Sequence, residues 1–182
     1  MTNIQKQSRR VRLFFQCLLF LTPIGVCYYW LTVQTPNDFL TMMGFVQTSI
    51  DIGSYTQQPL TMMTRILAMI SSLLLSGVIL YALRVLIHLF KNYEQNEIFT
   101  LDNAKCYRKL GYSIFYWVGG SVVYGTAMSA ILSFNNPPGE RLLTVTFAGI
   151  DFLTLIFGMI ILIISWVMQE GFRIADENNH TI

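Results

Sequence analysis

The chain has 182 residues, of which 53% are hydrophobic and 12% are charged, and its formal net charge is +2. Soluble domains carry about 25% charged residues, so the polar residues here are too few to cover the surface of a soluble domain of this size. The composition also excludes intrinsic disorder, which needs low hydrophobicity and high net charge. The small charge gives no support for direct binding to nucleic acid. We therefore expect an integral membrane protein in contact with the lipid bilayer.

Four apolar runs are long enough to be membrane-spanning helices, because about 20 helical residues cross the hydrocarbon core of a bilayer. We place them at residues 13–33, 62–88, 110–134 and 142–168. None of these runs shows the polar face that a soluble helix of this length would have. The expected fold is all-α, an integral membrane four-helix bundle in which residues 1–182 form a single membrane domain.

The positively charged residues predict the orientation of the chain. Ten of the twelve Lys and Arg lie before the first run, in or beside the connector at 89–109, or in the tail at 169–182. Arg65 and Arg141 are the two that fall toward the other side. Because cytoplasmic loops are enriched in Lys and Arg, we expect a multi-pass protein of the bacterial inner membrane with both termini in the cytoplasm.

The connector between the first two runs is long and carries a periodic apolar pattern. Its apolar residues recur at helical spacing: Phe39, Met42, Met43, Val46 and Ile50. This spacing predicts a short extracytoplasmic amphipathic segment. The segment either caps the bundle or forms a contact surface for a ligand or partner.

Small residues repeat at every fourth position of the second and third runs. The two sets are Thr64, Ala68, Ser72 and Ser76, and then Ser121, Gly125, Ser129 and Ser133. Helices in membranes associate through such close-packing residues, so we expect these strips to face other helices. A polar conduit lined by the serines is the alternative interpretation.

Asp151 is the one carboxylate inside the fourth run, and we expect it about two turns from the outer surface. A carboxylate in the hydrocarbon zone should be neutral or paired. The expected partners are Tyr124, Thr126 or Ser129 on the third run, or Arg65 on the second. The pattern favours a structural hydrogen bond between helices, with a proton or cation site as the alternative.

No catalytic or cofactor motif occurs in the sequence. There are only two histidines, and the three cysteines, Cys17, Cys27 and Cys106, lack metal-type spacing. Walker loops, Gly-x-Ser-x-Gly and His-Glu-x-x-His are also missing. We therefore expect no cofactor, no metal site and no enzymatic activity.

In the connector at 89–109, Thr100 or Asp102 is expected to cap a helix that runs into the third span.

Two stretches together resemble a known family. The first is Asn-Glu-Ile-Phe-Thr at 96–100, followed by Asn103, Arg108 and Leu-Gly at 110–111. The second is Asp151, then Glu-Gly-Phe-Arg at 170–173 and the ending at 177–182. They resemble the bacterial domain-of-unknown-function family 2975, small four-span membrane proteins. Genes of that family commonly lie beside a small helix-turn-helix regulator, so the resemblance implies a membrane sensor or tether for such a regulator.

Three functions remain open from the sequence. The first is a non-enzymatic module that acts by protein–protein interaction through its cytoplasmic connector and tail. The residues proposed to contact a partner are Glu97, Ile98, Phe99, Arg108, Glu170, Arg173 and Glu177. The second is an immunity protein against a membrane-acting toxin, and the third is a small transporter or channel that uses Asp151. A homo-oligomer is compatible with each.

Overall fold

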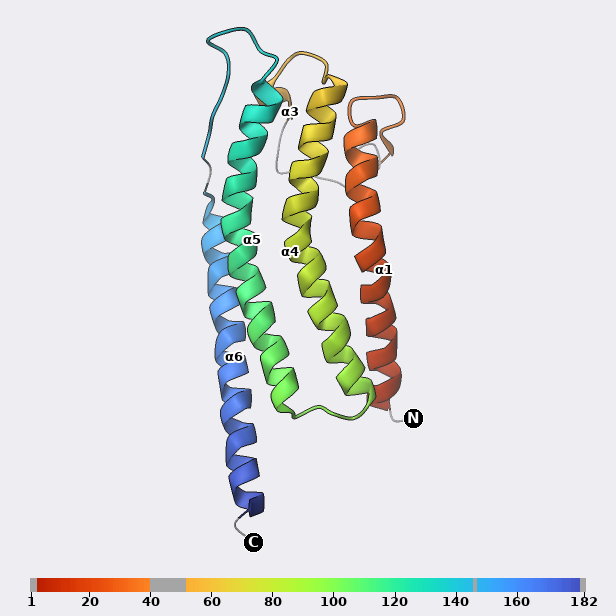
Figure 1. Ribbon diagram of the computed structural model, residues 1–182, viewed down its shortest axis with the longest axis vertical. Coiled ribbons are helices and arrows are strands. Elements are labelled where there is room, and N and C mark those ends of the chain that lie inside the picture. Colours follow the sequence, from red (N-terminus) through yellow and green to blue (C-terminus); the bar gives the residue numbers. More distant parts are fainter. Residues whose placement is uncertain (1–2, 40–51, 146, 181–182) are drawn as a thin grey trace. The chain divides into compact units, whose positions relative to one another are not determined.

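The computed structural model describes residues 3–39, 52–145 and 147–180. Its helices are α1 (Asn3–Thr32), α3 (Ile52–Tyr55), α4 (Met62–Glu94), α5 (Leu101–Ser133) and α6 (Gly149–His180) (Figure 1). No strand occurs within these described ranges. The all-α class is therefore confirmed. The predicted stripe from Met42 to Ile50 lies outside the described residues.

Four of the helices, α1, α4, α5 and α6, are long and apolar enough to cross a membrane. Large apolar side chains lie exposed along them, such as Leu74, Val123 and Phe157. Exposure of so much apolar surface to water would be unfavourable in free energy. Contact of the same side chains with lipid tails carries no such cost. The fold is thus compatible with a four-helix membrane bundle, as the composition predicts.

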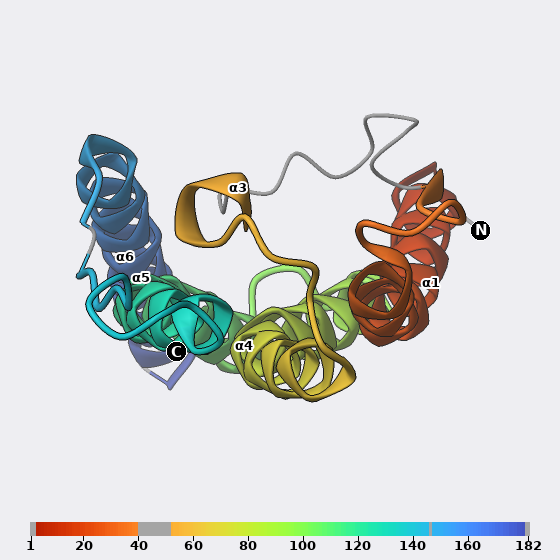
Figure 2. The ribbon, with the colours of Figure 1, turned by 90° about the horizontal axis from the view of Figure 1, so that it is seen from above.

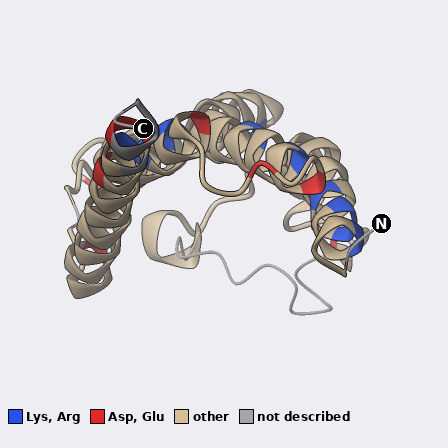
Figure 3. Cartoon of the chain, turned by 90° about the horizontal axis from the view of Figure 1, so that it is seen from below, with Lys and Arg blue, Asp and Glu red and all other residues tan. Residues whose placement is uncertain are grey.

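All four long helices extend well beyond the predicted spans at one end, and α6 continues past residue 168 to His180. The first turns of α1 carry Lys6, Arg9, Arg10 and Arg12 (Figure 3). Helix α4 continues to Glu94, and α5 begins at Leu101 rather than at Leu110. Hydropathy marks only the part of a helix that lies in lipid, while backbone hydrogen bonding continues into the polar flanks.

The start of the fourth span is the main difference from the prediction. Residues 142–145, 147 and 148 are not helical, and α6 begins at Gly149. The backbone N–H of Leu142 donates to Oγ of Ser133 (2.9 Å), and that of Thr144 donates to Oγ of Ser129 (3.0 Å). The extended segment is thus held along α5 by two serines that we expected to face another helix.

The chain divides into two compact units, each made of parts of several helices. Unit 1 comprises Met1–Phe20, Val78–Val118 and Ala148–Ile182. Unit 2 comprises Leu21–Gly77 and Gly119–Phe147. The core of unit 1 includes Val85, Leu89 and Cys106. The core of unit 2 includes Trp30, Val33, Ile52, Leu60, Ala68, Met128 and Leu132.

In unit 2 the short helix α3 and the chain that follows it lead into α4 (Figure 2). Ile52 of α3 and Leu60 are both buried in the core of the unit. Thr61 lies just before α4 and shares a hydrogen bond with Thr64 (2.8 Å). Its hydroxyl also accepts the backbone N–H of Thr64 (3.3 Å), which satisfies one of the free donors at the helix start.

Candidate functional site

The connector loop, residues 95–100 between α4 and α5, begins with a defined turn. Asn96 has a positive φ of 65°, a conformation that asparagine tolerates better than most residues. The N–H of Asn96 donates to the carbonyl of Tyr93 (3.2 Å), and that of Glu97 donates to the carbonyl of Asn92 (3.0 Å). This pair of bonds is a Schellman cap. The chain therefore leaves α4 in a fixed direction.

A single buried amide, that of Asn103 in the first turn of α5, holds the rest of the connector loop. Asn103 has no exposed surface. Its Nδ2 donates to the carbonyl oxygens of Glu97 and Ile98, and its Oδ1 accepts from Nδ2 of Asn92 (2.8 Å). Buried amide groups left without partners are costly. These bonds therefore fix the loop backbone against both helix ends.

Thr100 caps α5, as the sequence predicts. The backbone N–H of Asn103 donates to Oγ1 of Thr100 (3.2 Å). This is the bond expected between an N-cap hydroxyl and the third residue of a helix. The other expected capping residue, Asp102, lies one residue inside α5 and bonds instead to side chains of α4.

Phe99 stands at the exposed tip of the fixed loop. It is 83% exposed, the highest value among the large apolar residues of the described chain. Glu97 and Arg108, also predicted to contact a partner, are exposed, while Ile98 is half-buried. Further basic residues lie exposed on the two flanking helix ends, namely Lys91, Lys105 and Lys109. The connector thus presents one exposed aromatic ring near charges of both signs, of which the exposed basic residues outnumber the exposed acidic residues Glu97 and Asp102.

A polar cluster lies on the same two helix ends. Oδ2 of Asp102 is 2.7 Å from Nε2 of His88 and accepts from Nδ2 of Asn92 (2.9 Å). The donor atoms of His88, Asp102 and Cys106 all lie within 4.8 Å of one another. Cys106 is buried, whereas the other two are exposed. This combination of nitrogen, oxygen and sulfur atoms is one that could hold a metal ion.

The other helices of unit 1 are tied to this end of α4 and α5. Arg12 of α1 forms an ion pair with Glu94 of α4 (2.9 Å). Oγ of Ser165, on α6, donates to the carbonyl of Ala104 on α5 (2.8 Å). These contacts anchor the two helix ends from which the connector loop extends.

The predicted tail residues are engaged with one another on α6. Nη2 of Arg173 lies 2.7 Å from Oε1 of Glu170, and Nε of Arg173 lies 3.6 Å from Oε1 of Glu177. Exposed pairs spaced three and four residues apart stabilise a helix only slightly. The structure therefore shows a charged face of α6 at these positions.

The expected interhelical partners of Asp151 have other partners in the structure. Arg65 donates from Nη1 to the carbonyl of Val33 (2.6 Å) and thereby caps the end of α1. The hydroxyl of Tyr124 shares a hydrogen bond with Ser72 (2.9 Å), which also accepts from the indole of Trp30 (2.7 Å). These bonds link α1, α4 and α5 within unit 2.

Asp151 itself stands in the first turn of α6. Its Oδ2 accepts the backbone N–H of Ala148 (2.8 Å). A carboxylate there satisfies a free donor at the helix start and interacts favourably with the helix dipole. The predicted start of the fourth helix at Leu142 is wrong, because residues 142–145, 147 and 148 are not helical. Asp151 therefore lies in the first turn of α6 rather than about two turns inside the helix.

Most members of the two small-residue strips are buried, but Gly125 has no close neighbour among the described residues. Thr64, Ala68 and Ser76 are buried on α4, and Ser129 and Ser133 are buried on α5. A Cβ atom added at Gly125 would meet no described atom within 4 Å. The expectation that Gly125 permits close approach of another helix is therefore wrong.

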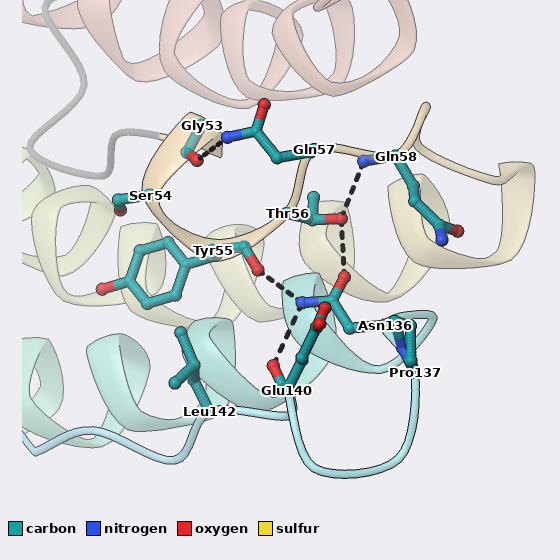
Figure 4. Close-up of a pocket in the computed structure, with 10 residues that line it drawn as sticks. All are labelled: Gly53, Ser54, Tyr55, Thr56, Gln57, Gln58, Asn136, Pro137, Glu140 and Leu142. Carbon is teal, nitrogen blue, oxygen red and sulfur yellow. Dashed lines mark hydrogen bonds between the residues drawn. The ribbon is translucent and has the colours of Figure 1, made fainter.

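A second candidate site is a cavity of about 310 Å³ in unit 2 (Figure 4). It is lined by residues 53–58 and by Asn136, Pro137, Glu140 and Leu142. The amide of Asn136 donates to the carbonyls of Tyr55 (2.8 Å) and Glu140 (3.2 Å) and accepts from Thr56 (2.8 Å). Asn136 thus links the segment at 53–58 with the connector between α5 and α6 at the edge of the cavity.

The comparisons with known proteins agree with the resemblance seen in the sequence. No curated protein and no solved structure matches the chain. The sequence pattern of DUF2975, described as a protein of unknown function, matches residues 51–182. The match covers α3 to α6 and includes the connector loop. The chain therefore belongs to the DUF2975 family.

Proposed function

We propose that this protein is a non-enzymatic membrane tether whose connector loop binds a soluble protein, with the side chain of Phe99 as the anchor. The observation that carries the proposal is the combination of an 83% exposed ring with a backbone fixed by the buried Asn103. An apolar ring exposed to this degree contributes nothing to the fold of the chain itself. Aromatic anchors of this kind dominate the affinity of protein interfaces.

The fixed backbone makes the loop suited to binding. A flexible loop would lose conformational entropy when it docks, which weakens affinity. Here the Schellman cap, the Thr100 cap and the Asn103 amide order the loop before a partner arrives. The exposed basic residues around Phe99 would form a polar rim that favours a partner with an acidic surface.

Ten of the twelve Lys and Arg lie on the side of the connector loop and the termini, and two lie on the other side. This distribution supports a cytoplasmic location for the connector loop and both termini of a protein in a bacterial inner membrane. A partner of the loop is then a cytoplasmic protein. A small helix-turn-helix regulator, the partner that the family resemblance implies, fits this location. Held at the membrane by the tether, such a regulator would be kept away from DNA.

An immunity protein against a membrane-acting toxin is the second candidate. The observation that favours it is the cavity in unit 2, whose lining residues belong to the α1–α4 and α5–α6 connectors, the two that the sequence predicts to lie outside. A toxin approaching from outside would meet these residues. The transporter hypothesis has less support, because the carboxylate of Asp151 caps its own helix.

Site-specific crosslinking in living cells tests the tether. A photoreactive phenylalanine analogue replaces Phe99 in the full-length protein, and the control analogue replaces Gln95, which is exposed in the same loop. We expect the analogue at position 99 to crosslink to a helix-turn-helix protein, and the analogue at position 95 to crosslink to it much more weakly. In a separate experiment, the Phe99→Ala protein should no longer co-purify with this partner. Phe134→Ala, an exposed ring on the opposite connector, should keep the partner. Adducts with lipid alone at position 99 would reject the proposal.

A further inference from the structure

Two pairs of polar side chains face each other across α4 and α5 just below the connector loop. His88 and Asn92 are spaced four residues apart on α4, and Asp102 and Cys106 are spaced four residues apart on α5. Residues at this spacing lie on one face of a helix, one turn apart. The side chains of the two pairs meet, since both His88 and Asn92 bond to Oδ2 of Asp102.

We propose that His88, Asp102 and Cys106 form a binding site for a divalent transition-metal cation of the zinc type. The three donor atoms already converge, because each pair lies within 4.8 Å and the His88–Asp102 pair is at 2.7 Å. Ligand atoms around a tetrahedral zinc ion lie about 3–4 Å apart. The separations in the structure are therefore close to those that a zinc ion needs.

The donor set selects the class of cation. Imidazole nitrogen, thiolate sulfur and carboxylate oxygen together suit zinc and related metals. Calcium and magnesium prefer sites made of oxygen atoms alone. Binding would release the thiol proton of Cys106 to solvent, since the thiolate is the ligand. Three protein ligands leave a fourth position for water.

The surroundings of the cluster support a cation. The side chains of His88 and Asp102 are 53% and 56% exposed, so a cation can reach them from solvent. Cys106 closes the buried side of the site. Asn92 donates to both Asp102 and Asn103 and so orients the carboxylate, as residues behind metal ligands commonly do.

A bound cation would crosslink the two helix ends that carry the connector loop. His88 lies less than two turns before the end of α4, and Asp102 and Cys106 lie in the first two turns of α5. The occupancy of the site would then set how firmly the loop is held. The metal site is independent of the proposed tether, because it needs no partner protein.

Cobalt binding to the purified full-length protein, in detergent and without a histidine tag, tests the site. Co²⁺ is the probe because a thiolate ligand gives it a charge-transfer absorption band that carboxylate and imidazole ligands do not. We expect each chain to bind one equivalent of Co²⁺ and to show this band, and we expect Zn²⁺ to displace the Co²⁺ and remove the band. The band should vanish in Cys106→Ser and persist in Cys17→Ser and Cys27→Ser.

His88→Gln gives an independent test, because His88 is exposed and its replacement should leave the fold intact. We expect the affinity for Co²⁺ to fall roughly tenfold or more, as losses around metal sites do. His180→Gln, which changes the other histidine of the chain, should bind as the unaltered protein does. Absence of the band, its survival in Cys106→Ser or unchanged affinity in His88→Gln would each overturn the proposal and leave an ordinary His88–Asp102 ion pair.

Discussion

The amide of Asn103 shows how one side chain determines the shape of a loop. Without it, the carbonyl groups of Glu97 and Ile98 would lose these part-buried hydrogen bonds, and the buried amide of Asn92 would keep Asp102 alone as its partner. Unsatisfied buried polar groups cost more than the hydrogen bonds are worth when made. Local sequence therefore dictates the connector loop, and Phe99 is exposed because its neighbours are held.

Replacing Asn103 with alanine should destabilise the protein. The change removes three hydrogen bonds, those to Glu97, Ile98 and Asn92, and leaves a small cavity, so we expect a loss of about 2–4 kcal/mol in the free energy of unfolding. The measurement is chemical denaturation in detergent micelles. Gln95→Ala, an exposed change in the same loop, should leave the stability within about 0.5 kcal/mol. Equal stability of the two variants would contradict the assigned role of Asn103.

At the scale of the helices, close packing between α5 and α6 in unit 1 depends on glycine. A Cβ atom at Gly111 would lie 2.5 Å from Cδ2 and 2.7 Å from Cγ of Leu162. One at Gly158 would lie 3.0 Å from Phe115 and 3.1 Å from Ile114. Small residues let helices approach in lipid, where no hydrophobic effect drives them together.

Gly111→Leu should therefore weaken the contact of α5 with α6. Overpacking costs about 1–3 kcal/mol, and the melting temperature in detergent should fall accordingly. Gly125→Leu is the matched control on the same helix, because a Cβ atom there would meet no atom of the described residues within 4 Å. A control that melts as low as Gly111→Leu would show that the loss reflects the bulk of leucine rather than the packing of α6.

The start of α6 allows a test of Asp151 as a capping residue. Asp151→Asn keeps an acceptor for the N–H of Ala148 but loses the charge near the helix dipole, a cost of about 0.3–1 kcal/mol. Asp151→Leu also loses the acceptor and should cost about 1 kcal/mol more. Melting temperature and cellular phenotype are measured for both. A stable Asp151→Asn protein with no activity would favour the transporter.

At the scale of the whole molecule, the orientation in the membrane can be tested by cysteine labelling. Cys106 is 2% exposed and so is a poor reporter. Phe99→Cys, in a background with Cys17→Ser and Cys27→Ser, places an exposed thiol on the basic connector. An impermeant maleimide should label it in inside-out vesicles but not in intact cells. Glu140→Cys, on the opposite connector, should show the reverse pattern. Labelling of position 99 in intact cells would show that the chain has the reverse orientation in the membrane.

The sequence by itself determined the class of the fold. Length, hydropathy and the lack of charge in four runs are properties of single segments, and a segment of that kind has one stable form in lipid, the helix. The cap at Thr100 also depends only on neighbouring residues. The amphipathic segment that Phe39 begins stays a prediction, because residues 40–51 lie outside the described ranges.

Tertiary structure decided the contacts of the polar residues. Hydropathy could not distinguish the non-helical residues 142–145 from a helix, since the backbone N–H groups of Leu142 and Thr144 bond to the side chains of Ser133 and Ser129. That difference places Asp151 in the first turn of α6 rather than about two turns inside a helix. His88, Asp102 and Cys106 show no metal-type spacing along the chain, and they meet because α4 and α5 fold back on each other. Contacts between residues on different helices depend on packing, which sequence spacing alone does not encode.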